Sequence, residues 1–449
     1  MKRTSPIQRL PLLLSLILGV IVVTAAPVLA VRPDSPLIPY TKVVLDNGLT
    51  VVVKEVHSAP IVAVDIWVAT GAKNEDPKDS GISHFFEHML FKGTERRKVG
   101  EIAKAIQSVG GYLNAMTSLD TTHYFVVVPS EYIDLALDVE ADAIMNSTFD
   151  PAEIERERNV ILEERRLVED NPQSKLGWMV YQAVFAGTPY ANDVLGTPET
   201  LANISRETFL RYHEKYYVPN NMVVVVVGDV DTWQVIQQVK KLFSGFKPRE
   251  VPPLPAFQVP GLKEIKRVEA EKQVDQTYLY FGFPGPSKTA KDSAALTVLG
   301  AILGGGRSSR LYQDLRENKK LVNTVAAGHQ AYQDIGMFVV YAQTKDTGVS
   351  TLEEEVRSAI RRIRNEGVTE EELSRAKAMA RSSFAFASES NAAIASILGE
   401  FEVSGSAEDA TEYEARIQEV TKEDVLRVAR EYLNPDGYVL AVVRPQGVK

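Results

Sequence analysis

The chain has 449 residues, with 50 Lys and Arg against 59 Asp and Glu, and it has no cysteine. Its formal net charge of −9 argues against a nucleic-acid partner, and the lack of cysteine excludes disulfides, thiolate metal sites and cysteine nucleophiles. A chain of this length predicts two or three domains rather than one.

Residues 1–30 have the pattern of a secretory signal peptide. A basic start with Lys2, Arg3 and Arg9 precedes an apolar stretch over 12–23, and small residues define a cleavage point at the end of the segment. The alternative is an uncleaved membrane anchor, because the apolar region is nearly long enough to span a bilayer. We therefore expect an exported protein of a bacterial periplasm, whose mature chain has a net charge of −12 and no membrane span.

Strand and helix patterns alternate through the first half of the mature chain. Residues 42–56 predict a hairpin, because the Asn47-Gly48 pair at its centre favours a tight two-residue turn. Hairpins combined with helices of unequal length favour an α+β unit with a mixed sheet over a doubly wound sheet. Apolar runs and helical periodicity predict strands over 61–70 and 122–129 and helices over 99–110, 131–147 and 151–168.

A proline-rich segment over 244–263 divides the mature chain into two halves of similar size. Its five prolines prevent a helix and disrupt strand pairing, so an extended linker is expected. The sequence therefore predicts a first domain over 31–243 and a second domain over 264–449.

The two halves resemble each other. Residues 204–227 align without gaps on residues 420–443, and each stretch has a Ser or Thr N-cap, an amphipathic helix, a proline-containing turn and an apolar strand. Residues 149–158 similarly match residues 368–377. A repeat of roughly 215 residues is too long for a solenoid and indicates the duplication of one α/β unit.

The segment GISHFFEHMLFKGTE, over 81–95, places His84, Glu87 and His88 on one face of a predicted helix. Two imidazoles on adjacent turns can hold a metal, and a catalytic zinc takes three protein ligands and leaves one position open. Glu87 cannot easily ligate beside both histidines, but it can accept a proton from a water molecule as a general base. The alternative is that two core histidines stand four residues apart by chance.

A third ligand is expected on the helix over 153–166. Its Glu157 and Glu164 share one face with apolar residues, which is unusual for a helix that only faces solvent. Glu164 could bind the metal while Glu157, two turns earlier, supports a histidine ring. Without the histidines, the same helix would be interpreted as a charged surface helix with Glu–Arg pairs.

The stretches SHFFEHMLFKGT and ERERNVILEE resemble the two zinc segments of the pitrilysin or insulinase family (M16) of inverted zinc peptidases, in the branch of mitochondrial processing peptidase and its bacterial relatives. The similarity covers nearly all of the mature chain. It implies a metallohydrolase of the processing-peptidase type, built from two homologous α/β units with helices packed on a mixed sheet. It also implies one Zn²⁺ per chain, with the metal ligands His84, His88 and Glu164, the catalytic base Glu87, the supporting acid Glu157, and Glu163 as the competitor of Glu164.

The segment GGYLNAMTSLDTTHYFVVVP, over 110–129, resembles the strand that lies beside the zinc at a sheet edge in this family. The resemblance places Asn114 and Ala115 against the substrate backbone, so that an extended peptide would add to the open edge. The alternative is an ordinary hairpin without a ligand. We interpret His123, in the same segment, as a strand residue, because the ligand set is already complete.

The second half does not repeat the metal residues. When Asp79-Ser80 is aligned with Asp292-Ser293, residues that cannot replace the ligands stand at every metal position. They are Thr297, Gly300 and Ala301 opposite the helix motif. On the alignment of residues 149–158 with 368–377, Ala376 and Ser383 stand opposite Glu157 and Glu164. The second half is therefore expected to be a domain without a metal.

One position departs from the family pattern. Members that cleave peptides usually supply an Arg and a Tyr, seven residues apart, which hold the substrate and stabilise the oxyanion. This chain offers Arg316 as a substrate-binding residue, but Asn323 stands at the Tyr position. The resemblance therefore implies a homodimer with impaired activity or a heterodimer with a homologue that carries the Arg and the Tyr.

Together these observations predict a zinc-dependent endopeptidase that cleaves peptides or unfolded segments, as the zinc-bearing subunit of a dimeric clamshell. The alternative is a scaffold or assembly subunit of the same superfamily without peptidase activity. The missing Tyr favours this alternative, and the intact metal set with Glu87 argues against it.

Overall fold

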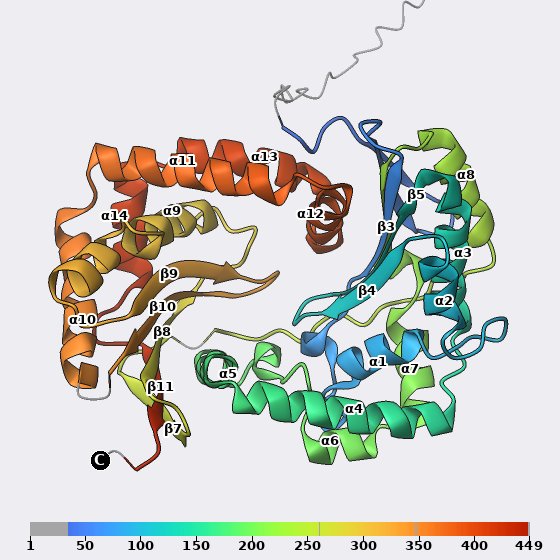
Figure 1. Cartoon of the computed structure of the whole chain (residues 1–449). Coiled ribbons are helices and arrows are strands. Elements are labelled where there is room, and N and C mark those ends of the chain that lie inside the picture. Colours follow the sequence, from blue (N-terminus) through green and yellow to red (C-terminus); the bar gives the residue numbers. More distant parts are fainter. Residues whose placement is uncertain (1–34, 260, 346–347, 448–449) are drawn as a thin grey trace, which may run out of the picture. The chain divides into compact units, whose positions relative to one another are not determined.

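The computed structural model describes residues 35–259, 261–345 and 348–447 (Figure 1). The predicted signal peptide lies outside the described residues. Within them, no helix combines the length and the apolar character that crossing a bilayer requires.

The first half of the chain builds a six-stranded sheet in the order β1-β2-β6-β3-β5-β4. β2 and β6 run parallel and the other neighbours are antiparallel, which confirms the expected mixed sheet. β1 and β2 form the predicted hairpin, where Gly48 has a φ of 83° that a residue with a side chain rarely adopts. The strands are β1 (Thr41–Val44), β2 (Thr50–Glu55), β3 (Ile61–Val68), β4 (Tyr112–Thr117), β5 (Thr122–Pro129) and β6 (Met222–Gly228).

Helices cover one face of this sheet and form the main core with it. Val64 of β3 and Val224 of β6 are buried there among apolar side chains of α1, α3 and α7. Local sequence sets the helix ends: Asp150 accepts hydrogen bonds from the first turn of α4, and Pro151 occupies the first helical position. The helices are α1 (Ile82–Leu90), α2 (Glu101–Gln107), α3 (Ile133–Asn146), α4 (Pro151–Asp170), α5 (Pro172–Val184), α6 (Pro198–Asn203), α7 (Arg206–Tyr216) and α8 (Thr232–Leu242).

The second half builds a five-stranded sheet in the order β7-β11-β8-β10-β9. Its one parallel pair, β7 with β11, corresponds to β2 with β6, so the sheet repeats the first without a counterpart of β1. The strands are β7 (Lys266–Lys272), β8 (Thr277–Gly285), β9 (Thr324–Ala331), β10 (Gly336–Thr344) and β11 (Val439–Pro445). The helices are α9 (Ser293–Gly304), α10 (Val349–Glu366), α11 (Glu370–Ala387), α12 (Asn391–Ser404), α13 (Ala407–Glu419) and α14 (Lys422–Tyr432).

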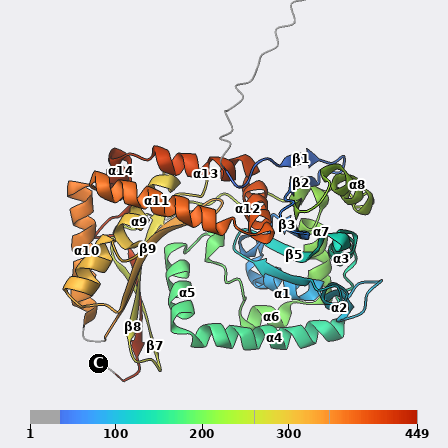
Figure 2. The same ribbon diagram turned by 45° about the horizontal axis from the view of Figure 1, so that its top comes forward.

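Each sheet is covered on its second face by a helix from the other half of the chain (Figure 2). α12 lies on β3 and β6, and the approach is so close that a Cβ on Gly399 would lie 2.2 Å from Nε1 of Trp67. α5 lies on β8 and β11, where Leu176 and Val180 pack near Val439. The two halves therefore exchange one helix each, and the apolar clusters beneath these two helices contain residues of both halves.

The described residues between α8 and β7 contain no helix or strand. Phe257 of this segment packs near Tyr190 of the first half, with 5.8 Å between the ring centres. The domain boundaries at residues 243 and 264 stay predictions.

Candidate metal centre

α1 is fixed at its first turn by a side chain from outside the helix. Gly81 precedes the helix with a φ of 95° and has no side chain to cap the unpaired backbone N–H groups. The carboxylate of Glu75 accepts hydrogen bonds from Gly81 N at 2.7 Å and from Ser83 N at 2.9 Å. Burial raises the pKa of Glu75 to about 8, although these two bonds oppose the rise.

The apolar face of α1 determines where its polar face points. Phe85 and Phe86 are fully buried, and the Phe85 ring meets Phe209 of α7 with 5.0 Å between the ring centres. Since this face packs in the core, the polar side chains of His84, Glu87 and His88 face α4 and β4.

Three side chains from α1 and α4 converge in one group. Nε2 of His84 and Nε2 of His88 lie 3.7 Å and 3.6 Å from Oε2 of Glu164, and the ligand atoms of all three residues lie within 4.8 Å of one another. Atoms bound tetrahedrally to zinc at the usual distances are about 3.3 to 3.4 Å apart, so these residues fit a zinc ion with little rearrangement. The neighbouring Glu163 points away and pairs with Arg166, and its side chain is 65% exposed.

His84 is suited to bind a metal as a neutral imidazole. Burial, together with the nearby His88, lowers the pKa of His84 to about 3. Its Nδ1 is buried and has no hydrogen-bond partner among the described residues, while its Nε2 faces Glu164. A ring in this state offers a lone pair to a cation without first losing a proton.

Glu157 supports His88 from the same helix that carries Glu164. Its Oε2 lies 3.2 Å from Nδ1 of His88, and its Oε1 lies 2.7 Å from Nζ of Lys92. A hydrogen bond to Nδ1 fixes the tautomer of the ring and leaves Nε2 available as a ligand.

Glu87 lies beside the three-residue group and is held by β4. Thr117, at the end of β4, donates a hydrogen bond from Oγ1 to Oε2 of Glu87 at 2.6 Å. Burial raises the pKa of Glu87, while the Thr117 bond and the neighbouring His88 oppose the rise. Thr117 is absent from the sequence prediction, although its position two residues after Ala115 in a strand indicates the same face.

β4 is an edge strand next to this group. It pairs with β5 on one side, and no other described strand pairs with it. Tyr112 and Met116 are exposed on one face of β4, with the predicted Asn114 between them. Oδ1 of Asn114 accepts a hydrogen bond from Ala115 N at 2.9 Å, so an added peptide strand would compete with this side chain for the amide.

His123 lies on β5 and is not one of the three grouped residues. Its Nδ1 lies 2.9 Å from Oδ1 of Asp65, and its ring stacks on Trp67 with 3.9 Å between the ring centres. The structure therefore gives His123 partners within the sheet.

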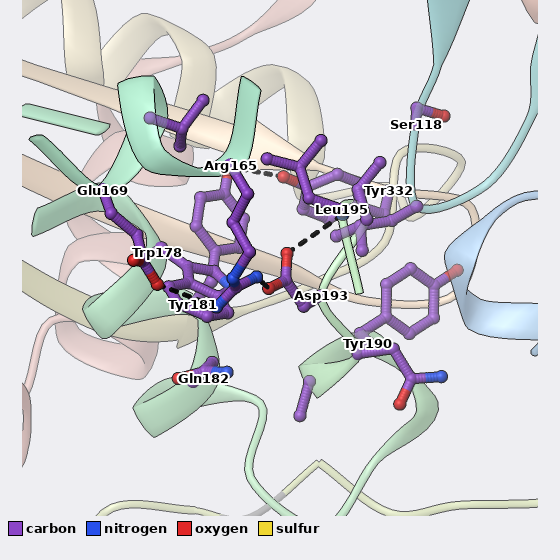
Figure 3. Close-up of a pocket in the computed structure, with 15 residues that line it drawn as sticks. Ser118, Arg165, Glu169, Trp178, Tyr181, Gln182, Tyr190, Asp193, Leu195 and Tyr332 are labelled. Carbon is purple, nitrogen blue, oxygen red and sulfur yellow. Dashed lines mark hydrogen bonds and ion pairs between the residues drawn. The ribbon is translucent and has the colours of Figure 1, made fainter. Parts of the chain in front are cut away.

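A largely apolar cavity of about 330 Å³ lies between the end of β4 and the helices α4 and α5 (Figure 3). Its walls come from segments that are far apart in the sequence. They include Ser118 and Leu119 after β4, Val168 on α4, Trp178 and Tyr181 on α5, Tyr190, Leu195, and Tyr332 from the second half.

Arg165, directly after Glu164, ties α4 to the start of α1. It pairs with Asp193, donates to the carbonyl oxygen of Gly196, and lies over the Trp178 ring in the cavity wall (Figure 3). Gly196 in turn packs against Gly81, where a Cβ would lie 2.8 Å from Cα of Gly196. This chain of contacts sets the position of α4 relative to α1.

The predicted substrate residue Arg316 lies in the second half, on the π-helix η6 (Tyr312–Asn318). Its guanidinium lies 4.9 Å from the centre of the Tyr312 ring, and Asn323 donates a hydrogen bond to Gln276. In the part of the chain that the structure describes, neither Arg316 nor Asn323 forms a hydrogen bond or ion pair with the grouped residues.

α9 is the counterpart of α1 in the second half, and glycines bring it directly onto the edge strand. A Cβ on Gly300 would lie 2.8 Å from Cα of Gly328, and one on Gly304 would lie 2.0 Å from Ala327 N. At these two positions the contact leaves no space for a side chain, and the described residues contain no second group of three possible ligands.

Comparison with known families matches both halves. The family described as Insulinase (Peptidase family M16) matches residues 50–198, and the one described as Peptidase M16 inactive domain matches residues 203–380. A Bacillus subtilis protein named uncharacterized zinc protease YmxG is 32% identical, over 89% of this chain and 97% of its own length. An uncharacterized zinc protease of Rickettsia felis is 36% identical, over 77% of this chain and 83% of its own length. The chain therefore belongs to the insulinase (M16) family of peptidases.

Solved structures have the same fold. A protease from Helicobacter pylori has a TM-score of 0.85 at 27% identity and covers 91% of this chain and 99% of its own. A Pseudomonas fluorescens structure described as a peptidase M16 inactive domain has a TM-score of 0.84 at 22% identity and covers 92% of this chain and 99% of its own. At this identity, the similarity shows a shared fold and nothing about activity. Together with the two sheets, these structures confirm the predicted fold class of two homologous α/β units.

Proposed function

We propose that the chain is a zinc-dependent endopeptidase that cleaves peptides or unfolded segments held as an added strand on β4. The observation that carries the proposal is the group of His84, His88 and Glu164 with Glu87 beside it. A zinc ion held by these three residues would act as a Lewis acid that polarises the scissile carbonyl and acidifies a water molecule.

The chemistry of the chain itself centres on Glu87. Its carboxylate accepts a proton from the attacking water and then delivers it to the nitrogen of the leaving amine, so that one C–N bond breaks and one C–O bond forms. Thr117 holds Oε2 of Glu87, which leaves Oε1 to receive the proton. Burial of Glu87 favours its protonated form, which suits a group that must store a proton between the two steps.

The edge position of β4 supports the substrate part of the proposal. A peptide that adds to an edge strand is bound largely through its backbone, so its sequence matters little along most of its length. The cavity beside the end of β4 adds a preference for one apolar or aromatic side chain, since Trp178, Tyr181 and Tyr190 line it.

Asn323, which stands at the family's Tyr position, suggests that the chain works with a partner. Within one chain, the oxyanion of the reaction would lack the family's Tyr, and in the described structure Arg316 forms no hydrogen bond or ion pair with the grouped residues. We therefore propose an exported peptidase that works as a homodimer or beside a homologue with the missing Arg and Tyr. Asn323 at the Tyr position also favours the second candidate function, a non-catalytic subunit.

The replacement of Glu157 by Gln should weaken zinc binding by about 10- to 100-fold, because the His88 ring loses its negatively charged support. The measurement is a chelator competition that gives the zinc affinity. Glu155→Gln, a change at an exposed position of the same helix, is the matched control. An unchanged affinity for Glu157→Gln would contradict the supporting role.

The proposed function is tested with the purified mature chain and a library of quenched-fluorescent peptides, with zinc content measured in parallel. We expect about one zinc per chain and cleavage that is lost with a chelator and restored by zinc. A second arm adds a neighbouring homologue that carries the Arg and Tyr pattern. Bound zinc without cleavage in either arm would favour the non-catalytic subunit.

A further inference from the structure

The tip of the β9–β10 hairpin, residues 332–335, reaches from the second half to the edge of the first sheet. A hydrogen bond from Tyr332 N to Ile335 O at 2.7 Å closes the tip. Gln333 N then donates to Oδ2 of Asp120 at 2.9 Å. Asp120 belongs to the turn over 118–121 that joins β4 to β5, so the half without metal residues contacts the place where β4 ends.

Lys73 joins the two sides of this contact. Its Nζ lies 2.8 Å from Oδ1 of Asp120 and 2.9 Å from Oδ2 of Asp334, and it donates to Oε1 of Gln333 at 2.7 Å. The Lys73 side chain is only 5% exposed. A buried charge is stable only with partners, and here Asp120 and the more exposed Asp334 are the two counter-ions of Lys73.

Tyr190 lies between the same two carboxylates. Its hydroxyl is 2.6 Å from Oδ1 of Asp120 and 2.8 Å from Oδ2 of Asp334, and it accepts a hydrogen bond from Asp334 N. A hydroxyl has one proton, so it can donate to only one carboxylate at a time. Lys73 pairs with both carboxylates, so the three charged groups and the Tyr190 hydroxyl form one connected cluster.

The turn over 118–121 is continuous with the residue that holds Glu87. Backbone bonds from Ala72 N and Lys73 N to the carbonyl oxygens of Ser118 and Leu119 fix the turn to the Lys73 segment. Thr117 directly precedes this turn and donates to Glu87. A shift of the turn would therefore move both the end of β4 and this hydrogen bond.

The same hairpin tip also forms part of the cavity wall. The Tyr332 ring lies 5.6 Å from the Tyr190 ring and 5.9 Å from the Tyr181 ring, centre to centre, and its hydroxyl donates to that of Tyr181 (Figure 3). One short turn thus contacts both the strand end and the cavity.

We propose that the β9–β10 hairpin contributes to substrate binding at the peptidase site, although it belongs to the half without metal residues. Gln333 and Asp334 position the end of β4 through Asp120 and Lys73, and Tyr332 sets the size of the side chain that the cavity accepts. This inference rests on the proposed function. Lys73, Asp120 and Asp334 are positioning residues, because they act through the strand and do not touch the reacting atoms.

The test uses Asp334→Asn in the full mature chain, which keeps the shape of the side chain but removes one charge next to Lys73. The matched control is Asp275→Asn, at an exposed position between β7 and β8 of the same sheet. We expect Asp334→Asn to raise KM for a peptide with an aromatic residue by about three- to tenfold, with zinc content unchanged. Hydrogen exchange of the amides over 112–121 should also become faster in this variant only.

The exchange measurement needs no cleavage, so it separates this inference from the proposed function. If the parent chain cleaves no peptide either alone or with the homologue, the proposed function fails, and the exchange over 112–121 still decides whether the hairpin holds β4. Exchange and KM equal to those of Asp275→Asn would overturn the inference.

Tyr332→Ala tests the cavity wall. We expect the ratio of kcat/KM for a peptide with Trp over one with Ala to rise at least about threefold, while Tyr332→Phe, which keeps the ring, leaves the ratio unchanged. The same ratio in the Ala variant and the parent would remove Tyr332 from the proposal.

Discussion

Replacing Glu87 by Gln is expected to lower kcat for peptide cleavage by about 10²- to 10⁴-fold while zinc stays bound. The amide keeps the shape of the carboxylate and can still accept the hydrogen bond from Thr117, but it cannot take up a proton. Since Glu87 is not one of the three grouped residues, the change leaves the metal ligands intact.

The measurement is kcat on a peptide substrate together with zinc content, for Glu87→Gln and for Glu95→Gln as a control. Glu95 lies five residues after the end of α1 and is exposed, so the same change there removes a charge without touching the site. Cleavage by Glu87→Gln at the parent rate would refute its role as the base. Loss of zinc would instead place Glu87 among the ligands.

Loss of a residue that only supports a metal ligand typically weakens metal binding by 10- to 100-fold, or about 1.4 to 2.7 kcal/mol. Replacing Glu164 by Gln should weaken zinc binding by more than this. An amide oxygen carries no charge, and the two histidines alone leave the site one ligand short. The rate of peptide cleavage should fall in parallel, because a smaller fraction of the protein carries zinc.

Glu163→Gln is a matched control for this variant, because Glu163 lies one residue earlier on α4 and pairs with Arg166 in solvent. The zinc affinity of Glu163→Gln should equal that of the parent chain. If the two variants exchange these results, the third ligand is Glu163, and α4 must rotate in the zinc-bound state.

The residues that local periodicity could bring together were predicted from the sequence. His84, Glu87 and His88 share a face because of helical spacing, and Glu157 and Glu164 do so for the same reason. The structure places His84, His88 and Glu164 in one group, which needed only the packing of α1 on α4 in addition. The mixed sheet and the hairpin at Asn47-Gly48 also followed from local signals.

The contacts that the sequence did not predict are those between segments far apart in the chain. Glu75 caps α1 from six residues before Gly81, and no capping pattern describes such a spacing. The contact of Gln333 with Asp120 spans more than two hundred residues. Such pairs depend on how the two halves pack, which a single sequence does not encode in any local period.

The helix exchange between the halves changes what a break in the chain would do. α5 precedes the proline-rich segment and α12 follows it, yet each is docked on the sheet of the opposite half. If a protease cut the chain within that segment, the two fragments would therefore stay associated, because each fragment covers an apolar face of the other. Unfolding either half would strip a helix from the other, so both should melt in one cooperative transition.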